Sequence, residues 1–189
     1  MKPQATEPGP NSQPVGINEG RPGWALAAFE ILTRVAGSYN GLITYSELAD
    51  EVQRSSGLFT RSPQRNWIGK VLADVAHRCH SEQLPALSAL VVHKHDGQVG
   101  DGYAEVLHIA GIDQIDDRLE REEHAAISRL ECYRHWCDNV PVDAKPRLSP
   151  ILEQRVSRVA PRREALLGDV CSRCFIEMPI SGLCASCDA

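Results

Sequence analysis

The stretch "GLITYSELADEV", Gly41–Val52, decides the predicted fold of the first half of the chain. "LITY" is a short extended piece, and Ser46 is well placed as the N-cap of a helix over "SELADEVQ". Acidic residues in the first turn of that helix suit its dipole. Just before it, "GSYNG" holds turn residues that end an earlier helix. The stretch therefore predicts a helix, a turn, a strand and a second helix.

Apolar spacing extends this pattern in both directions. It predicts a first helix over 24–36, a third from Pro63 to about His80, a long amphipathic helix from Ile112 to about Cys137, and a basic helix from Pro150 to Leu167. "ALSALVV", 86–92, is predicted to be a strand, followed by a turn over "HDGQVGDG". Gly69 lies inside the third helix, where it costs about 1 kcal/mol relative to alanine. We expect a close packing contact there.

Composition predicts a globular protein of the cytoplasm. Of 189 residues, 42% are hydrophobic and 24% charged, and no run is long enough for a membrane span. The N-terminus lacks the apolar core of a signal peptide. We predict four parts: a disordered tail (1–22), a main domain with a long C-terminal helix (23–139), a linker with a basic helix (140–168) and a cysteine-rich unit (169–189).

Two CxxC pairs near the C-terminus predict a metal site. Cys171, Cys174, Cys184 and Cys187 can present four thiolates to one ion, with "FIEMPISGL" as a hairpin between the pairs. Four sulfur ligands are typical of a closed, structural zinc site, so we predict a zinc ribbon with one zinc ion that is not catalytic. A redox pair is the competing use of CxxC. Such ribbons bind nucleic acid, bind protein or cap a fold, and the sequence does not choose among these.

The net charge of −5 is unevenly distributed. Residues 59–80 hold four basic side chains and one acidic side chain, and residues 140–168 hold six and three. Between them, residues 112–139 hold eight acidic and four basic side chains. Because binding depends on local charge, the two basic segments are candidates for contact with phosphate. The basic helix could equally be a solvated face.

Three segments in order, "GLITYSELADEV", "RNWIGKVLADV" and "LPALSALVVHKHDGQVGDGY", resemble the C-terminal domain of the alkylguanine-DNA alkyltransferases. That group includes alkyltransferase-like proteins, which bind alkylated DNA without chemistry. The resemblance covers residues 41–103 and implies a winged-helix-like domain with a DNA-binding helix-turn-helix. Tyr45 falls where the family presses on the DNA backbone, and Arg65 falls where an arginine fills the vacated base stack. Residues 66–72 would lie along the helix that enters DNA.

The same resemblance places Leu90 where the family has its acceptor cysteine. Leucine cannot accept an alkyl group, so alkyl transfer is excluded by this alignment. His93 and His95 leave open a metal-dependent hydrolase, since alternate strand residues share a face. Two further groups of possible metal ligands lie at helix ends: His77, Cys79 and His80, and Cys132, His135 and Cys137. The alternative is that these cysteines are buried core thiols and that the basic groups interact with the helix dipole. Two metal ions per chain would reopen the hydrolase alternative.

The sequence therefore predicts an α+β, mainly helical fold with a winged-helix-like domain and a four-cysteine zinc ribbon. The predicted function is non-catalytic nucleic-acid binding, with DNA favoured. The predicted contacts are Tyr45, Arg61, Arg65, Asn66 and Lys70. The alternative is an adaptor or regulatory protein that binds another protein through the ribbon and the acidic segment 112–123. No membrane contact is expected.

Overall fold

The structure is a computed structural model that describes residues 13–164, 170–175 and 186–187. Its elements, in chain order, are β1 (Gln13–Pro14), α1 (Ile17–Ala36), β2 (Ile43–Thr44), α2 (Tyr45–Ser56), β3 (Leu58–Phe59), the 3-10 turn η1 (Gln64–Asn66), α3 (Ile68–Ser81), the 3-10 turn η2 (Leu87–Leu90), β4 (Val91–Val92), α4 (Tyr103–Ile109), α5 (Arg118–Trp136) and α6 (Pro150–Glu164). The predicted class, α+β and mainly helical, is confirmed.

The chain divides into two units, residues 1–149 and residues 150–189. The predicted linker before Pro150 falls in the first unit, and the second unit begins with α6, the helix expected from Pro150. None of the helices in the described ranges is both long and apolar enough to cross a membrane.

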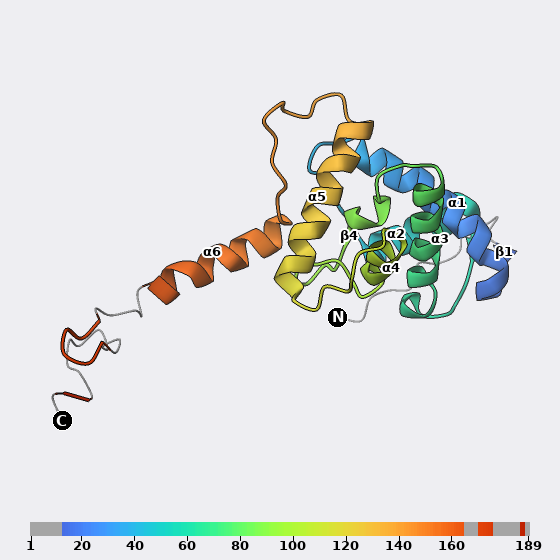
Figure 1. Cartoon of the computed structure of the whole chain (residues 1–189). Coiled ribbons are helices and arrows are strands. Elements are labelled where there is room, and N and C mark those ends of the chain that lie inside the picture. Colours follow the sequence, from blue (N-terminus) through green and yellow to red (C-terminus); the bar gives the residue numbers. More distant parts are fainter. Residues whose placement is uncertain (1–12, 165–169, 176–185, 188–189) are drawn as a thin grey trace. The chain divides into compact units, whose positions relative to one another are not determined.

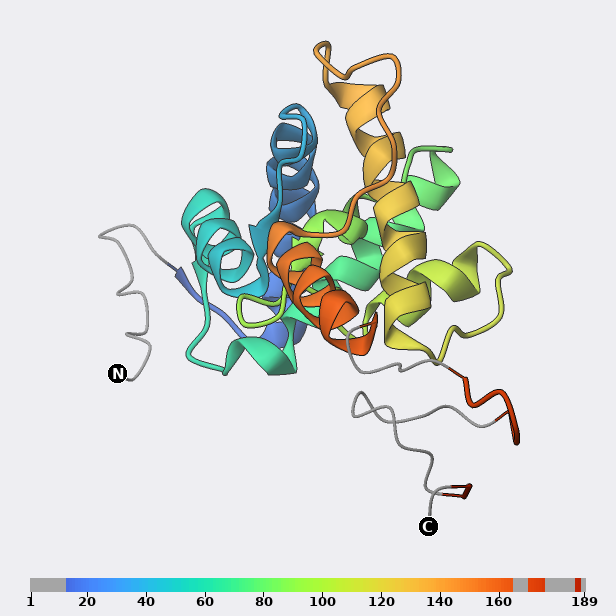
Figure 2. The same cartoon turned by 90° about the vertical axis from the view of Figure 1, so that its left-hand side faces the viewer.

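The core of the first unit lies between α1 and the segment η2–β4. Helices α2 and α3 both pack on α1, and η2 contacts α1, α3 and α5 (Figures 1 and 2). Every residue from Leu87 to Val92 is buried. The connection between α2 and α3, residues 57–67, holds β3 and η1 rather than a single tight turn. Helices α2 and α3 therefore take their positions from α1, whereas α4 packs on α3 and α5 packs on both η2 and α1.

The predicted strand 86–92 is mostly a 3-10 turn. Only Val91 and Val92 form a strand, which pairs in parallel with Ile43 and Thr44 of β2. The preceding residues Leu87–Leu90 form η2. Alanine and leucine have weak strand propensity, whereas the two β-branched valines favour it, so pairing is confined to the valines.

The first helix begins at Ile17, not at Trp24, and β1 precedes it. The prediction of a disordered tail to residue 22 is therefore wrong for residues 13–22. Arg21 from this part of α1 donates two hydrogen bonds to Asp74 of α3, at 2.6 and 2.5 Å. Gly20 allows the Trp24 ring to fold back, since a Cβ there would lie 2.5 Å from it. The Arg21–Asp74 pair joins residues 53 positions apart, so the polar, glycine-rich composition of this segment does not reveal it.

The N-cap of α2 is Thr44, not Ser46. Thr44 Oγ1 accepts a hydrogen bond from the Glu47 N–H at 3.3 Å, and the Glu47 carboxylate accepts one from the Thr44 N–H at 2.9 Å. This reciprocal pair is a capping box, which satisfies two backbone donors at the helix start. Thr44 fits because it also ends β2, so one residue closes the strand and opens the helix.

Two other boundaries and one whole helix differ from the prediction. The third helix is interrupted at its start: Pro63 precedes η1, and α3 proper begins at Ile68. The long helix begins at Arg118, because Asp117 accepts hydrogen bonds from two N–H groups of its first turn. Helix α4, a separate seven-residue helix, was not predicted. The final residues of the predicted basic helix, 165–167, lie outside the described residues.

Candidate nucleic-acid interface and metal centre

Four of the five predicted DNA contacts lie together on the exposed surface between β3 and the first turn of α3. Arg61, Arg65, Asn66 and Lys70 are all exposed. In the part of the chain that the structure describes, none of their side chains forms an ion pair or a hydrogen bond. We call these four residues the α3 basic face.

Other arginines of the first unit are engaged with carboxylates. Arg34 lies 3.3 Å from Glu51, and Arg21 is paired with Asp74. Arg78, which the sequence groups with the basic segment, donates to Glu82 at 2.9 Å and lies 3.7 Å above the Phe29 ring. It is thus part of the scaffold. No acidic residue occurs from 52 to 73, so the chain segment that carries the α3 basic face supplies no carboxylate to it.

Trp67 holds this face in place. The η1 turn is closed by hydrogen bonds from the Asn66 N–H to Pro63 O at 2.9 Å and from the Trp67 N–H to Gln64 O at 3.1 Å. The Trp67 side chain is only 1% exposed, and its ring lies 4.6 Å from that of Trp24. Burying this indole against α1 directs its neighbours in the turn outward. Trp67 is therefore a core residue and does not stand on the surface that would meet DNA.

No contact within the described protein requires glycine at position 69. A Cβ built there would meet no atom within 4 Å, and its backbone is exposed on α3. The expected packing contact is absent, so that prediction is wrong. Glycine nevertheless costs helix stability relative to alanine. The helix therefore presents a bare stretch of backbone between Asn66 and Lys70.

Tyr45 differs from the other predicted contacts because its hydroxyl has an internal partner. The Gly100 N–H donates to this hydroxyl at 3.0 Å, and the ring stacks on His93 with centroids 4.7 Å apart. Burial raises the pKa of the phenol. Glycine is needed at position 100, since a Cβ there would lie 2.6 Å from the Tyr45 hydroxyl. Tyr45 thus ties α2 to the glycine-rich turn.

The same turn is fixed from the other side by a buried ion pair that the sequence analysis missed. The Val99 N–H donates to Glu122 of α5, and the other oxygen of this carboxylate accepts from Arg129 at 3.1 Å. Both side chains are almost fully buried. A signal existed: Glu122 and Arg129 are seven residues apart, two turns on one helix face, and that face is otherwise apolar.

His93, His95 and Asp96 belong to a tight turn. The His93 backbone exchanges hydrogen bonds with Gln98 and Gly97 at 2.8 Å, and Gly97 has a φ of 72°. His95 lies 3.0 Å from Asp96. Within the described ranges, these side chains are not joined by a third potential ligand close enough to share an ion. Leu90, at the position aligned with the acceptor cysteine, is fully buried.

Three of the four predicted zinc ligands come together. The sulfur atoms of Cys171, Cys174 and Cys187 all lie within 4.8 Å of one another, and Cys171 is buried. Thiolates at about 2.3 Å from a tetrahedral ion lie about 3.8 Å apart, so the cluster could hold a metal ion. The backbone turns at this point, where the Phe175 N–H donates to Cys171 O at 2.9 Å. The fourth predicted ligand, Cys184, lies outside the described residues.

Two of the three remaining cysteines have the character of core residues, and the third, Cys137, is half-buried. Cys79 and Cys132 are both buried, and burial raises the pKa of each thiol. These thiols stay protonated at neutral pH, which suits neither a nucleophile nor a ligand.

No protein-family model, no curated protein and no solved structure matches this chain.

Proposed function

We propose that the chain is a nucleic-acid-binding protein that contacts DNA through the α3 basic face and catalyses no reaction there. One observation carries the proposal: three exposed cations and an amide are clustered around the η1 turn and the start of α3, and none of them is paired with a carboxylate among the described residues. Such cations can exchange counterions for phosphates without first breaking an ion pair.

The four side chains of the α3 basic face would make different kinds of contact with DNA. Arg61, Arg65 and Lys70 would neutralise phosphates and set the orientation of the protein, whereas Asn66 can both donate and accept hydrogen bonds at a base edge. Gly69 would let the helix backbone approach the nucleic acid closely. This combination accounts for an exposed helix glycine that intramolecular packing does not require.

The resemblance to alkyltransferase-like proteins supports the same surface. It would make residues 66–72 the helix that meets DNA, but we assign Arg65 to phosphate rather than to the base stack, because its side chain is exposed beside Arg61 and Lys70. With Leu90 at the position of the acceptor cysteine, the chain would transfer no alkyl group. Tyr45 would then act on DNA only indirectly, by fixing the glycine-rich turn through Gly100.

Fluorescence anisotropy with labelled duplex and single-stranded DNA at low salt tests this proposal. We expect the triple variant Arg61→Ala/Arg65→Ala/Lys70→Ala to lose binding. Arg34→Ala is the matched control, because it removes an exposed arginine whose charge is already paired with Glu51. Equal binding by the triple variant and the control would reject the α3 basic face.

We also propose that the three-cysteine cluster, together with Cys184, holds one structural zinc ion. The support is the donor set: soft thiolates in paired CxxC knuckles suit zinc. A filled tetrahedral site leaves no position for a reacting water. Metal analysis of the purified chain should give one zinc per chain, and two would favour a second site.

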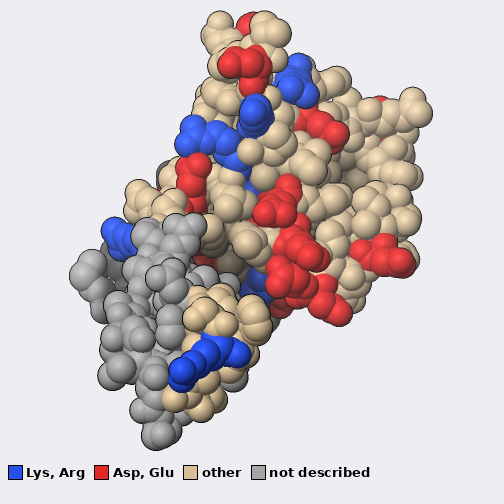
Figure 3. All heavy atoms as spheres, turned by 60° about the vertical axis from the view of Figure 1, so that its left-hand side comes forward, with Lys and Arg blue, Asp and Glu red and all other residues tan. Residues whose placement is uncertain are grey.

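A second candidate function, binding to a basic protein partner, is favoured by the surface of α5. Six acidic side chains in this region are exposed: Asp113, Asp116, Asp117, Glu120, Glu123 and Glu131. Figure 3 shows acidic side chains gathered along this face. Such a surface repels DNA and would steer a positively charged partner. A pull-down with the purified chain as bait would test this, with Glu120→Lys/Glu123→Lys as the control variant that should no longer retain a basic protein.

A further inference from the structure

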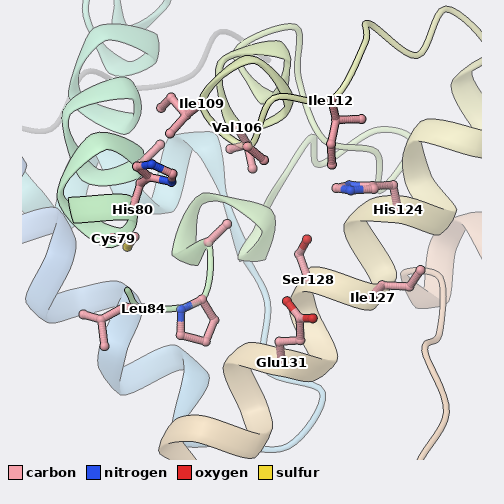
Figure 4. A pocket seen from close by; sticks show the side chains of 14 residues that line it. Cys79, His80, Leu84, Val106, Ile109, Ile112, His124, Ile127, Ser128 and Glu131 are labelled. Carbon is pink, nitrogen blue, oxygen red and sulfur yellow. The ribbon is translucent and has the colours of Figure 1, made fainter. Parts of the chain in front are cut away.

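A cavity of about 320 Å³ opens between α3, α4 and α5 in the first unit (Figure 4). This volume is at the lower end of the range for small-molecule sites. Its walls are mostly aliphatic, with Leu84, Val106 and Ile109 among the lining residues. At the mouth, Ile112 and Ile127 are 41% and 49% exposed. The apolar lining thus reaches the surface.

The polar groups of the cavity are concentrated on one wall. His124, Ser128 and Glu131 come from one face of α5, and His80 of α3 lies across the space from them (Figure 4). Two of these groups are fixed by the buried Tyr103, whose hydroxyl lies 2.9 Å from His124 Nδ1 and 3.0 Å from Ser128 Oγ. The wall is therefore organised before any ligand enters.

Glu131 is the charged group of this wall. Its carboxylate has no ion pair or hydrogen bond within the described part of the chain, and no lysine or arginine lines the cavity. The exposed acidic side chains of residues 113–131 surround the same helix. An anion entering the cavity would be repelled by these charges, and a purely apolar ligand would leave the exposed Glu131 carboxylate without a partner.

We propose that this cavity binds a small molecule with an apolar body and one protonated amino group. The body would lie against the aliphatic walls, and the ammonium would donate to Glu131 and the Ser128 hydroxyl. None of the residues of the α3 basic face lines the cavity. The proposal therefore goes beyond DNA binding and does not depend on it.

The test is an NMR titration of the full, zinc-loaded chain with ¹³C-labelled isoleucine methyl groups. The probes are benzylamine, 2-phenylethylamine and 3-phenylpropylamine, each compared with the alcohol of equal length at one fixed, moderate ionic strength. We expect saturable shifts of the Ile109, Ile112 and Ile127 signals by at least one amine. Its alcohol should bind roughly tenfold more weakly, because it lacks the charge-assisted hydrogen bond to Glu131.

Glu131→Gln should abolish the preference for the amine. Glu123→Gln is the matched control, since it removes the same charge from the same helix outside the cavity, and it should leave the preference intact. The proposal is overturned if no amine gives saturable shifts at these methyl groups, if amine and alcohol bind equally, or if both variants behave alike. Shifts of the exposed Ile112 and Ile127 signals without a shift of the Ile109 signal would show charge attraction at the surface only and would also reject it.

Discussion

Gly69→Ala separates a structural role of this glycine from a role in binding. Because the added methyl group meets no atom within 4 Å, it causes no clash in the free protein. Alanine also has the better helix propensity, so the variant should be more stable by about 0.5–1 kcal/mol. In the complex, the same methyl group would stand between the helix backbone and DNA. Overpacking at a close contact costs about 1–3 kcal/mol, so DNA affinity should fall roughly tenfold.

Urea unfolding followed by circular dichroism measures the first effect, and anisotropy with duplex DNA measures the second. Lys70→Ala on the neighbouring position serves as the comparison, because it should lower affinity without the gain in stability. If Gly69→Ala is stabilised and binds DNA as tightly as the wild type, the close approach of α3 is refuted. If it is destabilised, the surroundings of Gly69 have been described wrongly.

Three further predictions follow from the scaffold and the metal cluster. Arg129→Met should lower the free energy of unfolding by about 3–5 kcal/mol, because it leaves the Glu122 carboxylate buried without its cation. The double variant with Glu122→Gln should recover most of the loss. An Arg129→Met variant as stable as the wild type in urea would contradict this. Thr44→Ala should cost about 1 kcal/mol at pH 7 by removing the side-chain half of the capping box. The Thr44 hydrogen bonds lower the pKa of Glu47 below its ordinary value of 4.5. The stabilisation by this carboxylate is therefore present above pH 4.5 and is lost as the pH falls through the lower pKa of the folded state. Thermal unfolding of Thr44→Ala should depend less on pH below 4.5 than that of the wild type. Cys174→Ser should release zinc at lower chelator concentration while the far-UV spectrum of the first unit is retained, and unchanged zinc retention would argue against a ligand role.

Local signals identified most helices of this fold but not their ends. The apolar spacing of 24–36 and 46–53 is visible in the sequence because each helix has one buried face. The start of α1 at Ile17 is not, since it depends on Arg21 reaching Asp74, 53 residues away. The short helix α4 was missed because seven residues are too few to show a period.

The candidate site was partly predictable for the same reason. The cations of the α3 basic face are adjacent in sequence, so their clustering is a local property. That they lack carboxylate partners among the described residues is a property of the tertiary structure, as is the engagement of Arg78 and Tyr45. The cavity brings together residues from 76 to 131, and only Tyr103, buried between helices, shows why His124 and Ser128 face it.

The salt dependence of DNA binding tests the central claim most directly. Three phosphate-neutralising cations predict a slope of about −2.7 for log K against log salt, or about a 40-fold loss of affinity between 50 and 200 mM. Arg65→Ala should reduce the slope to about −1.8, and Arg34→Ala should leave it unchanged. The proposal is contradicted if the wild type does not bind at about 50 mM salt, or if Arg65→Ala gives the wild-type slope.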